Sequence, residues 1–249
     1  MIKPLVAGNW KMNGLRAAMD AVQAMSEELS RSEPDCDVVI CPPATLLPLL
    51  DQTLENSHIR LGAQDCHTGT SGAYTGDISA QMLKDAGASC VIVGHSERRS
   101  TYGETNAIVR AKAAAAHRAG LSAIVCVGET AGERRANLTV QVVERQLNAS
   151  LPDDSCANDV IVAYEPVWAI GSGQTPAPED VAKVHACMRR ALVERFKDGD
   201  QFRLLYGGSV KPGNAAELMA INHVNGALVG GASLVSEDFL GIISYYADK

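Results

Sequence analysis

The sequence predicts a single α/β domain over residues 1–249, in which eight parallel strands close into a (β/α)8 barrel. Short apolar, β-branched runs alternate with longer amphipathic segments along the chain, as buried strands and covering helices do. With eight such pairs in 249 residues, each pair takes about 31 residues, the usual size of a βαβ unit. Right-handed crossovers repeated eight times close a barrel of roughly this length.

The expected strands are short and often end at glycine or proline. Aromatic residues make up only 4% of the chain, so the core must be aliphatic, which suits parallel strands covered on both faces. An open doubly wound sheet is the alternative, but the first strand–helix turn lacks a G-x-G-x-x-G motif. The eight runs are 5–9, 38–41, 59–63, 90–93, 123–127, 160–164, 202–206 and 227–229.

The expected helices lie between these runs, where apolar residues recur at close to a 3.6-residue spacing. Residues 105–119 are rich in alanine, a strong helix former. Prolines and acids at 176–180 fit the first turn of the segment that follows. The pattern predicts helices over 15–29, 105–119, 138–147, 181–196 and 215–221.

Composition and charge argue against a nucleic-acid-binding, a secreted or a membrane protein. The net charge is −7 and the basic residues are scattered, so a nucleic-acid partner is not expected. The seven cysteines include no C-x-x-C pair and read as buried thiols in a reducing compartment. No apolar run is long enough for a signal peptide or a membrane span, so we expect a cytoplasmic protein without a membrane partner.

Polar and glycine-rich segments follow five of the expected strands. The first strand runs into Gly8-Asn9-Trp10-Lys11, the fourth into Gly94-His95, and the sixth is followed at once by Glu165. Strands seven and eight end in the glycine pairs Gly207-Gly208 and Gly230-Gly231. Because the active site of such a barrel lies at the carboxyl ends of its strands, we expect these segments to meet at one rim.

Glu165 and His95 are the expected acid–base pair. Glu165 precedes Pro166, which disfavours helix at Glu165, and a carboxylate in a partly dehydrated site can remove a proton from carbon next to a carbonyl. Residues 96–99 look like the start of a short helix, whose N-terminus disfavours positive charge. The imidazole of His95 is therefore expected to be neutral and to donate a hydrogen bond to substrate oxygens.

An acidic protein that binds an anion needs local positive potential. Lys11 is the one cation delivered by the first strand, and Asn9 can add a hydrogen bond. The glycine pairs, together with Ser209, allow the backbone to approach a phosphate closely, and barrel enzymes frequently hold phosphate after strands seven and eight.

These segments closely resemble the triosephosphate isomerase family, whose fold is the TIM barrel. The match runs from 7–13 through 71–79 and 94–99 to 229–234, in the family's order and spacing. The resemblance implies an isomerase that interconverts dihydroxyacetone phosphate and D-glyceraldehyde 3-phosphate through an enediol or enediolate, in glycolysis and gluconeogenesis. It implies no cofactor and no metal.

The resemblance also assigns the site residues. Glu97 is expected to hold Lys11 by an ion pair, and residues 166–175 resemble the family's lid, with Ser172 where most members have Thr. The implied catalytic residues are Glu165, His95, Lys11, Asn9 and Glu97. The implied substrate-binding residues are Asn9, Lys11, Gly171, Ser209, Gly230 and Gly231.

Residues 65–77 form a long loop with little periodicity. In the family this loop reaches into a neighbouring subunit, with Thr75 supporting that subunit's site, which implies a symmetric homodimer here. The chain has Asp65 where the family usually has Asn, and Asn225 where Asp is common. These departures concern the interface and stability rather than the reaction.

Two other functions remain open at this point. A barrel aldolase would use Lys11 as a Schiff-base nucleophile, which requires a desolvated lysine. A barrel that only binds phosphate would normally lack the acid or the base, and both are present here.

Overall fold

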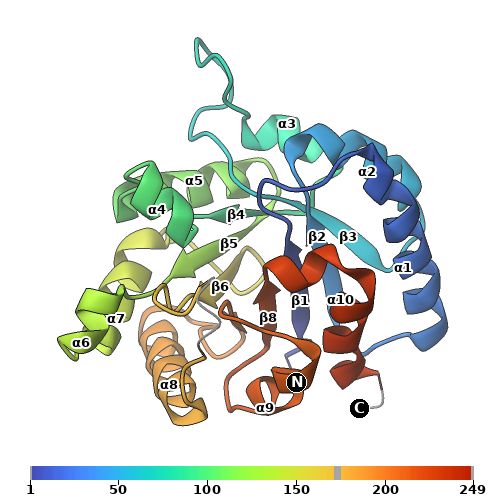
Figure 1. Ribbon diagram of the computed structural model, residues 1–249. Coiled ribbons are helices and arrows are strands. Elements are labelled where there is room, and N and C mark those ends of the chain that lie inside the picture. Colours follow the sequence, from blue (N-terminus) through green and yellow to red (C-terminus); the bar gives the residue numbers. More distant parts are fainter. Residues whose placement is uncertain (1, 171–174, 248–249) are drawn as a thin grey trace.

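A computed structural model describes residues 2–170 and 175–247 of the chain. The strands form a closed barrel in sequence order, and each strand pairs in parallel with the next (Figure 1). The predicted barrel is therefore confirmed. The strands are β1 Leu5–Asn9, β2 Asp37–Cys41, β3 Ile59–Ala63, β4 Cys90–Val93, β5 Ser122–Val127, β6 Val160–Tyr164, β7 Arg203–Tyr206 and β8 Gly226–Val229.

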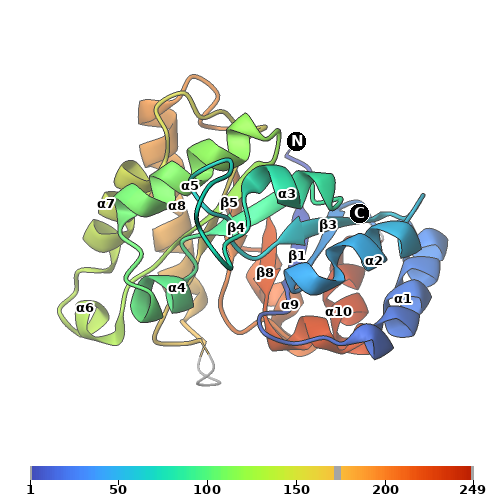
Figure 2. The same cartoon turned by 90° about the horizontal axis from the view of Figure 1, so that it is seen from above.

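Helices surround these strands. Figure 2 shows α5, α7 and α8 on one side of the strands and α1, α2 and α10 on the other. The α-helices are α1 Met19–Ser32, α2 Leu47–Thr53, α3 Ala80–Asp85, α4 Ser96–Thr101, α5 Asn106–Arg118, α6 Ala131–Arg135, α7 Thr139–Ser150, α8 Pro178–Arg195, α9 Pro212–Met219 and α10 Ser236–Ile243. Short 3₁₀ segments are η1 Arg16–Ala18, η2 Ala44–Leu46, η3 Gly231–Leu234 and η4 Ser244–Tyr246. No described helix is both long enough and apolar enough to cross a bilayer.

The expected elements agree closely with the structure, and the differences have simple causes. Every strand starts within one residue of its predicted start. The first helix begins later than predicted, at Met19, because η1 forms the turn before it. The helices α2, α3, α6 and α10 were not predicted, since they have five to eight residues each and show too few repeats of an apolar stripe.

Two layers of apolar side chains make up the core. One layer fills the inside of the barrel and includes Leu5, Ile92, Ile124 and Leu205. The other lies between the strands and the helices. Inside the barrel β3 contributes Gly62, where an added Cβ would meet the sulfurs of Cys41 and Cys90 at 2.6 and 2.8 Å. The inward-facing thiols thus occupy the space that a side chain on β3 would need.

A charged cluster lies at the amino ends of the strands. Asp37 of β2 accepts hydrogen bonds from Arg60 of β3 at 2.7 Å and from Arg203 of β7 at 2.8 Å. Lys3 lies 3.1 Å from the same carboxylate. Burial acts to raise the pKa of Asp37, but the three cations outweigh it, so the pKa lies below its ordinary value. One carboxylate therefore links β2, β3 and β7 across this end of the barrel.

Candidate active site

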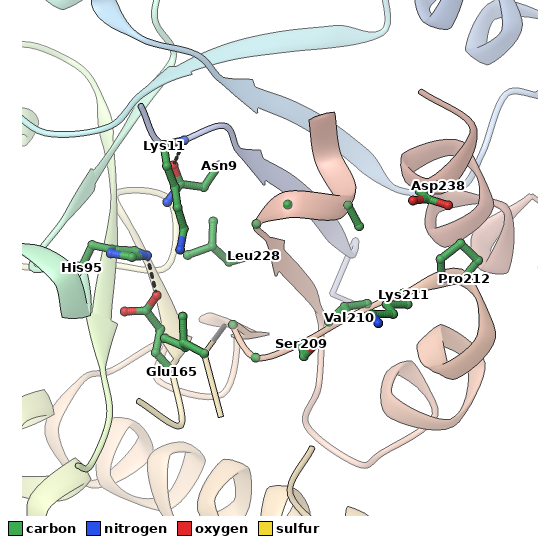
Figure 3. A pocket seen from close by; sticks show the side chains of 16 residues that line it. Asn9, Lys11, His95, Glu165, Ser209, Val210, Lys211, Pro212, Leu228 and Asp238 are labelled. Carbon is green, nitrogen blue, oxygen red and sulfur yellow. Dashed lines mark hydrogen bonds and ion pairs between the residues drawn. The ribbon is translucent and has the colours of Figure 1, made fainter. Parts of the chain in front are cut away.

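The carboxyl ends of the strands enclose a cavity of about 500 Å³. Glu165 and His95 approach each other at one side of it (Figure 3). Asn9 and Lys11 come from the end of β1, and the glycine turns come from the ends of β7 and β8. Of the predicted site residues in the described chain, the lining includes Asn9, Lys11, His95, Glu165, Ser209, Gly230 and Gly231.

Glu165 follows β6 directly and is almost completely buried, with 2% of its surface exposed. One carboxylate oxygen lies 2.9 Å from Nε2 of His95, and the other accepts a hydrogen bond from the Ser96 amide at 2.9 Å. Burial acts to raise the pKa of Glu165, but His95 and the Ser96 amide outweigh it, so the pKa lies below its ordinary value. Glu165 is therefore a carboxylate at neutral pH.

The backbone of Glu165 is held as closely as its side chain. Its amide donates to the Val127 carbonyl at 2.8 Å. A Cβ added at Gly128 would lie only 1.7 Å from the Glu165 carbonyl oxygen. Only glycine fits at this point after β5, so the strand ends of β5 and β6 approach closely.

His95 caps the N-terminus of α4, and its Nδ1 accepts the Glu97 amide at 3.2 Å. This bond requires a lone pair on Nδ1 and therefore directs an Nε2–H toward Glu165. Burial acts to lower the pKa of His95, but the Glu165 carboxylate outweighs it, so the pKa lies above its ordinary value. The expected neutral ring is thus favoured by burial and by the helix end but opposed by Glu165 as long as the two side chains touch.

Lys11 lies in a left-handed turn, with φ of 53°. Its amide donates to Oδ1 of Asn9 at 3.0 Å, and Nε2 of Gln64 donates to its carbonyl at 2.7 Å. Nζ donates to Glu97 at 2.5 Å, the ion pair that the sequence predicted. Glu97 itself is half exposed and is not part of the cavity lining. Gln64 was missed by the sequence reasoning, because its partner is distant in the chain.

The parts of the cavity that follow β7 and β8 are built largely from backbone. Gly207 and Gly208 follow β7, and Gly230 leads into η3, so these segments present little side chain to the cavity. The Gly230 carbonyl accepts hydrogen bonds from the amide and the hydroxyl of Ser233 at 2.8 and 2.7 Å. Turns of glycine backbone suit a phosphate group, because backbone amides can approach it closely. The predicted contact at Gly171 lies outside the described residues.

The segment after Glu165 is anchored by a buried carboxylate. Oε1 of Glu129 accepts a hydrogen bond from the Trp168 indole at 2.8 Å, and the Tyr164 hydroxyl donates to the same group. The Arg134 guanidinium lies 3.9 Å from the centre of the Trp168 ring. Glu129 is fully buried and no sequence signal distinguished it. Ile170, at the end of this segment, lines the cavity.

The loop between β3 and α3 extends away from the rest of the molecule (Figure 1). Thr75 is exposed on it. At its base Asp65 accepts hydrogen bonds from the buried Lys112 at 2.6 and 2.7 Å and pairs with Arg98 at 2.9 Å. Lys112 also donates to Glu104 at 2.6 Å. The acid at position 65 therefore joins a network of two acids and two bases, which the sequence did not predict.

No group of three or more metal-ligating side chains lies together within 2–170 and 175–247. The cavity instead joins a carboxylate, an imidazole, one paired lysine and glycine backbone. This set of groups can move protons on a ligand that carries an anion.

Comparison with known proteins identifies the family. The family model described as "Triosephosphate isomerase" matches residues 4–246. The triosephosphate isomerase of Bradyrhizobium sp. (strain ORS 278) is 57% identical over 243 residues, covering 97% of each chain. That of Rhizobium meliloti is 55% identical over 249 residues, covering 99% of this chain and 97% of the relative.

A solved structure agrees with these relatives. The crystal structure of triosephosphate isomerase from Bartonella henselae superposes with a TM-score of 0.93 at 52% identity, covering 98% of this chain and 99% of the other. The fold, the cavity and the similarity over nearly the full length all point the same way: the chain belongs to the triosephosphate isomerase family.

Proposed function

We propose that the chain interconverts dihydroxyacetone phosphate and D-glyceraldehyde 3-phosphate, the isomerase step shared by glycolysis and gluconeogenesis. The observation that carries this is the 2.9 Å contact between Glu165 and His95 in a cavity that is also lined by glycine backbone. A base and a proton donor beside an anion-binding wall are what an aldose–ketose isomerisation of a phosphate ester needs. One carbon of the substrate is oxidised as its neighbour is reduced, so the net redox change is zero and the reaction needs no external oxidant or reductant.

Glu165 acts as the base in this proposal. Its carboxylate takes a proton from the hydroxymethyl carbon of dihydroxyacetone phosphate, and the C–H electron pair forms the new C=C bond. The carbonyl π pair moves onto oxygen and gives the enediolate. Glu165 then returns the proton to the adjacent carbon, which yields the aldehyde. Burial with 2% exposure supports this role, because little water competes for the carboxylate.

His95 serves the two substrate oxygens. Its Nε2–H protonates the oxygen that was the carbonyl, and the ring then accepts the proton of the neighbouring hydroxyl. The amide donated to Nδ1 supports this assignment, since it keeps the exchangeable proton on Nε2. The charge of Lys11 and the amide of Asn9 stabilise the enediolate, with Glu97 positioning Lys11.

The phosphate is held by backbone amides and one hydroxyl. Ser209, Gly230 and Gly231 are assigned to it because they line the cavity after β7 and β8. The resemblance adds Gly171, which lies outside the described residues. Closure of residues 166–175 over the ligand would exclude water and protect the enediolate from losing its phosphate.

An aldolase reaction through Lys11 is the rejected alternative. A Schiff-base lysine should be desolvated and free, whereas Lys11 is bound to Glu97 and about one-third of its side chain is exposed. Borohydride treatment in the presence of a keto-sugar phosphate should leave the protein unmodified. A covalent adduct on Lys11 would instead favour an aldolase reaction over the isomerase reaction.

The protein is further proposed to be a cytoplasmic homodimer. The extended loop that carries Thr75, with Tyr74 half exposed beside it, supports a second copy as the partner. All seven cysteines are free thiols, which supports a reducing compartment. Sedimentation at micromolar concentration should give twice the chain mass of 26.3 kDa, and a monomer would contradict the dimer.

A coupled assay on purified protein tests the reaction itself. Wild-type protein should convert each triose phosphate into the other, and Glu165→Gln should remove nearly all of that activity while its circular dichroism spectrum is retained. An inactive wild-type protein, or a fully active Glu165→Gln variant, would overturn the proposal.

A further inference from the structure

The cavity extends beyond the groups that the proposed reaction uses. Its volume of about 500 Å³ falls within the roughly 300–1,000 Å³ of pockets that hold drug-sized ligands, so a three-carbon phosphate fills only part of it. Figure 3 shows His95 and Glu165 on one side of the view, Lys211 and Asp238 on the other, and Ser209 between them. We call the part lined by Val210, Lys211, Pro212 and Asp238 the outer end.

The outer end carries one lysine and one acid, Lys211 and Asp238, which form no ion pair with each other. Lys211 is exposed and forms no ion pair with any residue in 2–170 or 175–247. Lys11, the other cation of the lining, is already paired with Glu97. The chain as a whole carries a net charge of −7, which opposes the approach of an anion on average. Of the two lysines that line the cavity, Lys211 is therefore the one whose charge is available to an approaching anion.

The backbone of Lys211 is fixed relative to Ser209, one of the proposed phosphate-binding residues. Its amide donates to Oδ1 of Asn214 at 2.7 Å, and Nδ2 of Asn214 donates to the Ser209 carbonyl at 3.0 Å. One side chain thus ties Ser209 and Lys211 into a single turn. Lys211 is also the residue before α9, whose N-terminus adds positive potential at the same place.

We propose that Lys211 attracts the doubly charged phosphate ester to the outer end of the cavity, from which the ester passes to the Ser209 and glycine wall. The proposal rests on the proposed function and adds a residue that sets how fast substrate is captured. Asp238 lies in the first turn of α10 at the same end and acts with the opposite sign. Capture therefore depends on the balance of these two charges.

The experiment compares charge changes at the outer end with equal changes elsewhere. Lys211→Gln and Lys211→Glu are matched by Lys197→Gln and Lys197→Glu, because Lys197 is exposed just beyond the C-terminal end of α8. Asp238→Asn is matched by Glu194→Gln, an exposed acid on α8. For each variant kcat and KM are measured with D-glyceraldehyde 3-phosphate at ionic strengths from about 0.01 to 0.3 M, a range over which the screening length falls from about 30 to below 10 Å.

At low salt we expect kcat/KM to fall about 2- to 5-fold in Lys211→Gln and further in Lys211→Glu, through KM, with kcat unchanged. Asp238→Asn should raise kcat/KM, and all these differences should shrink as salt is added. The Lys197 and Glu194 variants should follow the wild type.

Two results would overturn the proposal. The first is equal effects of the Lys211 and Lys197 variants, since that would reflect net charge alone. The second is a loss in kcat that salt does not change, which would make Lys211 part of the chemical step or the fold. Failure of the proposed function is distinguishable, because the wild-type protein would then show no isomerase activity at any salt concentration.

Discussion

The Glu165 carboxylate is fixed by contacts on both of its oxygens, to His95 and to the Ser96 amide. Its reach is set by the length of one side chain from the end of β6. Shortening that side chain by one methylene would withdraw the base from the substrate carbon by about 1 Å, a misplacement that costs roughly 10²-fold in rate.

Glu165→Asp should therefore lower kcat by about 10²-fold or more and change KM comparatively little. Steady-state kinetics in both directions would measure it. Glu27→Asp, the same change at an exposed position of α1, serves as the control. Near-normal turnover of Glu165→Asp would remove this residue from the proposed role.

The proposed roles of Glu165 and His95 predict different pH dependences for kcat/KM and for kcat. Glu165, with a lowered pKa, stays ionised at neutral pH, so the acid limb belongs to His95, which must be neutral. In the free enzyme Glu165 raises the pKa of His95, and kcat/KM should fall as the pH drops through that raised value. Substrate oxygens that lie between the two side chains weaken the influence of Glu165 on the pKa of His95. The acid limb of kcat should therefore lie at lower pH than the acid limb of kcat/KM.

Parallel profiles of kcat and kcat/KM test this ordering. The substrate phosphate, with a second pKa of about 6, affects kcat/KM in every variant. His95→Gln isolates that contribution, because it cannot be protonated. An acid limb of kcat/KM that is the same in His95→Gln and in the wild type would assign the limb to the substrate alone.

At this scale the sequence predicted only part of the site. Glu165, His95 and Lys11 could be named because each lies at the end of an apolar run, where a barrel collects its functional groups. Gln64 and Glu129 could not, since their significance lies in contacts with Lys11 and Trp168, far away in the chain. Such contacts exist only once the barrel has closed.

The ends of β5 and β6 illustrate how elements position Glu165, the proposed base. Gly128→Ala would place a Cβ against the backbone of Glu165 rather than against a flexible side chain. We expect kcat to fall by about 10²-fold and the free energy of unfolding to drop by about 1–3 kcal/mol. Kinetics and urea denaturation would measure both.

Gly213→Ala is the matched control for this change. Gly213 lies in α9, and an added Cβ there meets nothing within 4 Å. It should be neutral or slightly stabilising. If Gly128→Ala also left kcat and stability unchanged, the close approach of the ends of β5 and β6 would not be needed to position Glu165.

Elements differ in how far their sequence determines them. The eight strands were predictable, because each is a short, mainly apolar run bounded by turn residues. The helices α2 and α10 were not, because packing against the barrel, more than an apolar repeat of their own, stabilises such short segments.

The whole barrel is linked by the charges at its amino end. Asp37 has a lowered pKa in the folded protein, so its stabilising effect is complete above the unfolded value of about 3.9 and is lost as the pH falls through the lower folded value. Asp37→Asn should lower the free energy of unfolding at pH 7 by about 1–3 kcal/mol.

Denaturant unfolding at pH 7 and at about pH 3 would check the sign. The difference between Asp37→Asn and wild type should shrink in acid, where both carry a neutral side chain in the unfolded chain. Asp154→Asn, an exposed acid, is the comparison at both pH values. A difference that grew in acid would contradict the assignment of Asp37 as the anion that joins β2, β3 and β7.

Because Glu165 and His95 contact each other at 2.9 Å, a substrate has to separate the two side chains before it can react. A triose without a phosphate group has only the binding energy of its hydroxyl and carbonyl groups with which to separate Glu165 from His95. Its kcat should therefore fall as well as its affinity for the protein. Adding an inorganic anion that binds the glycine backbone of the cavity should restore part of the lost kcat.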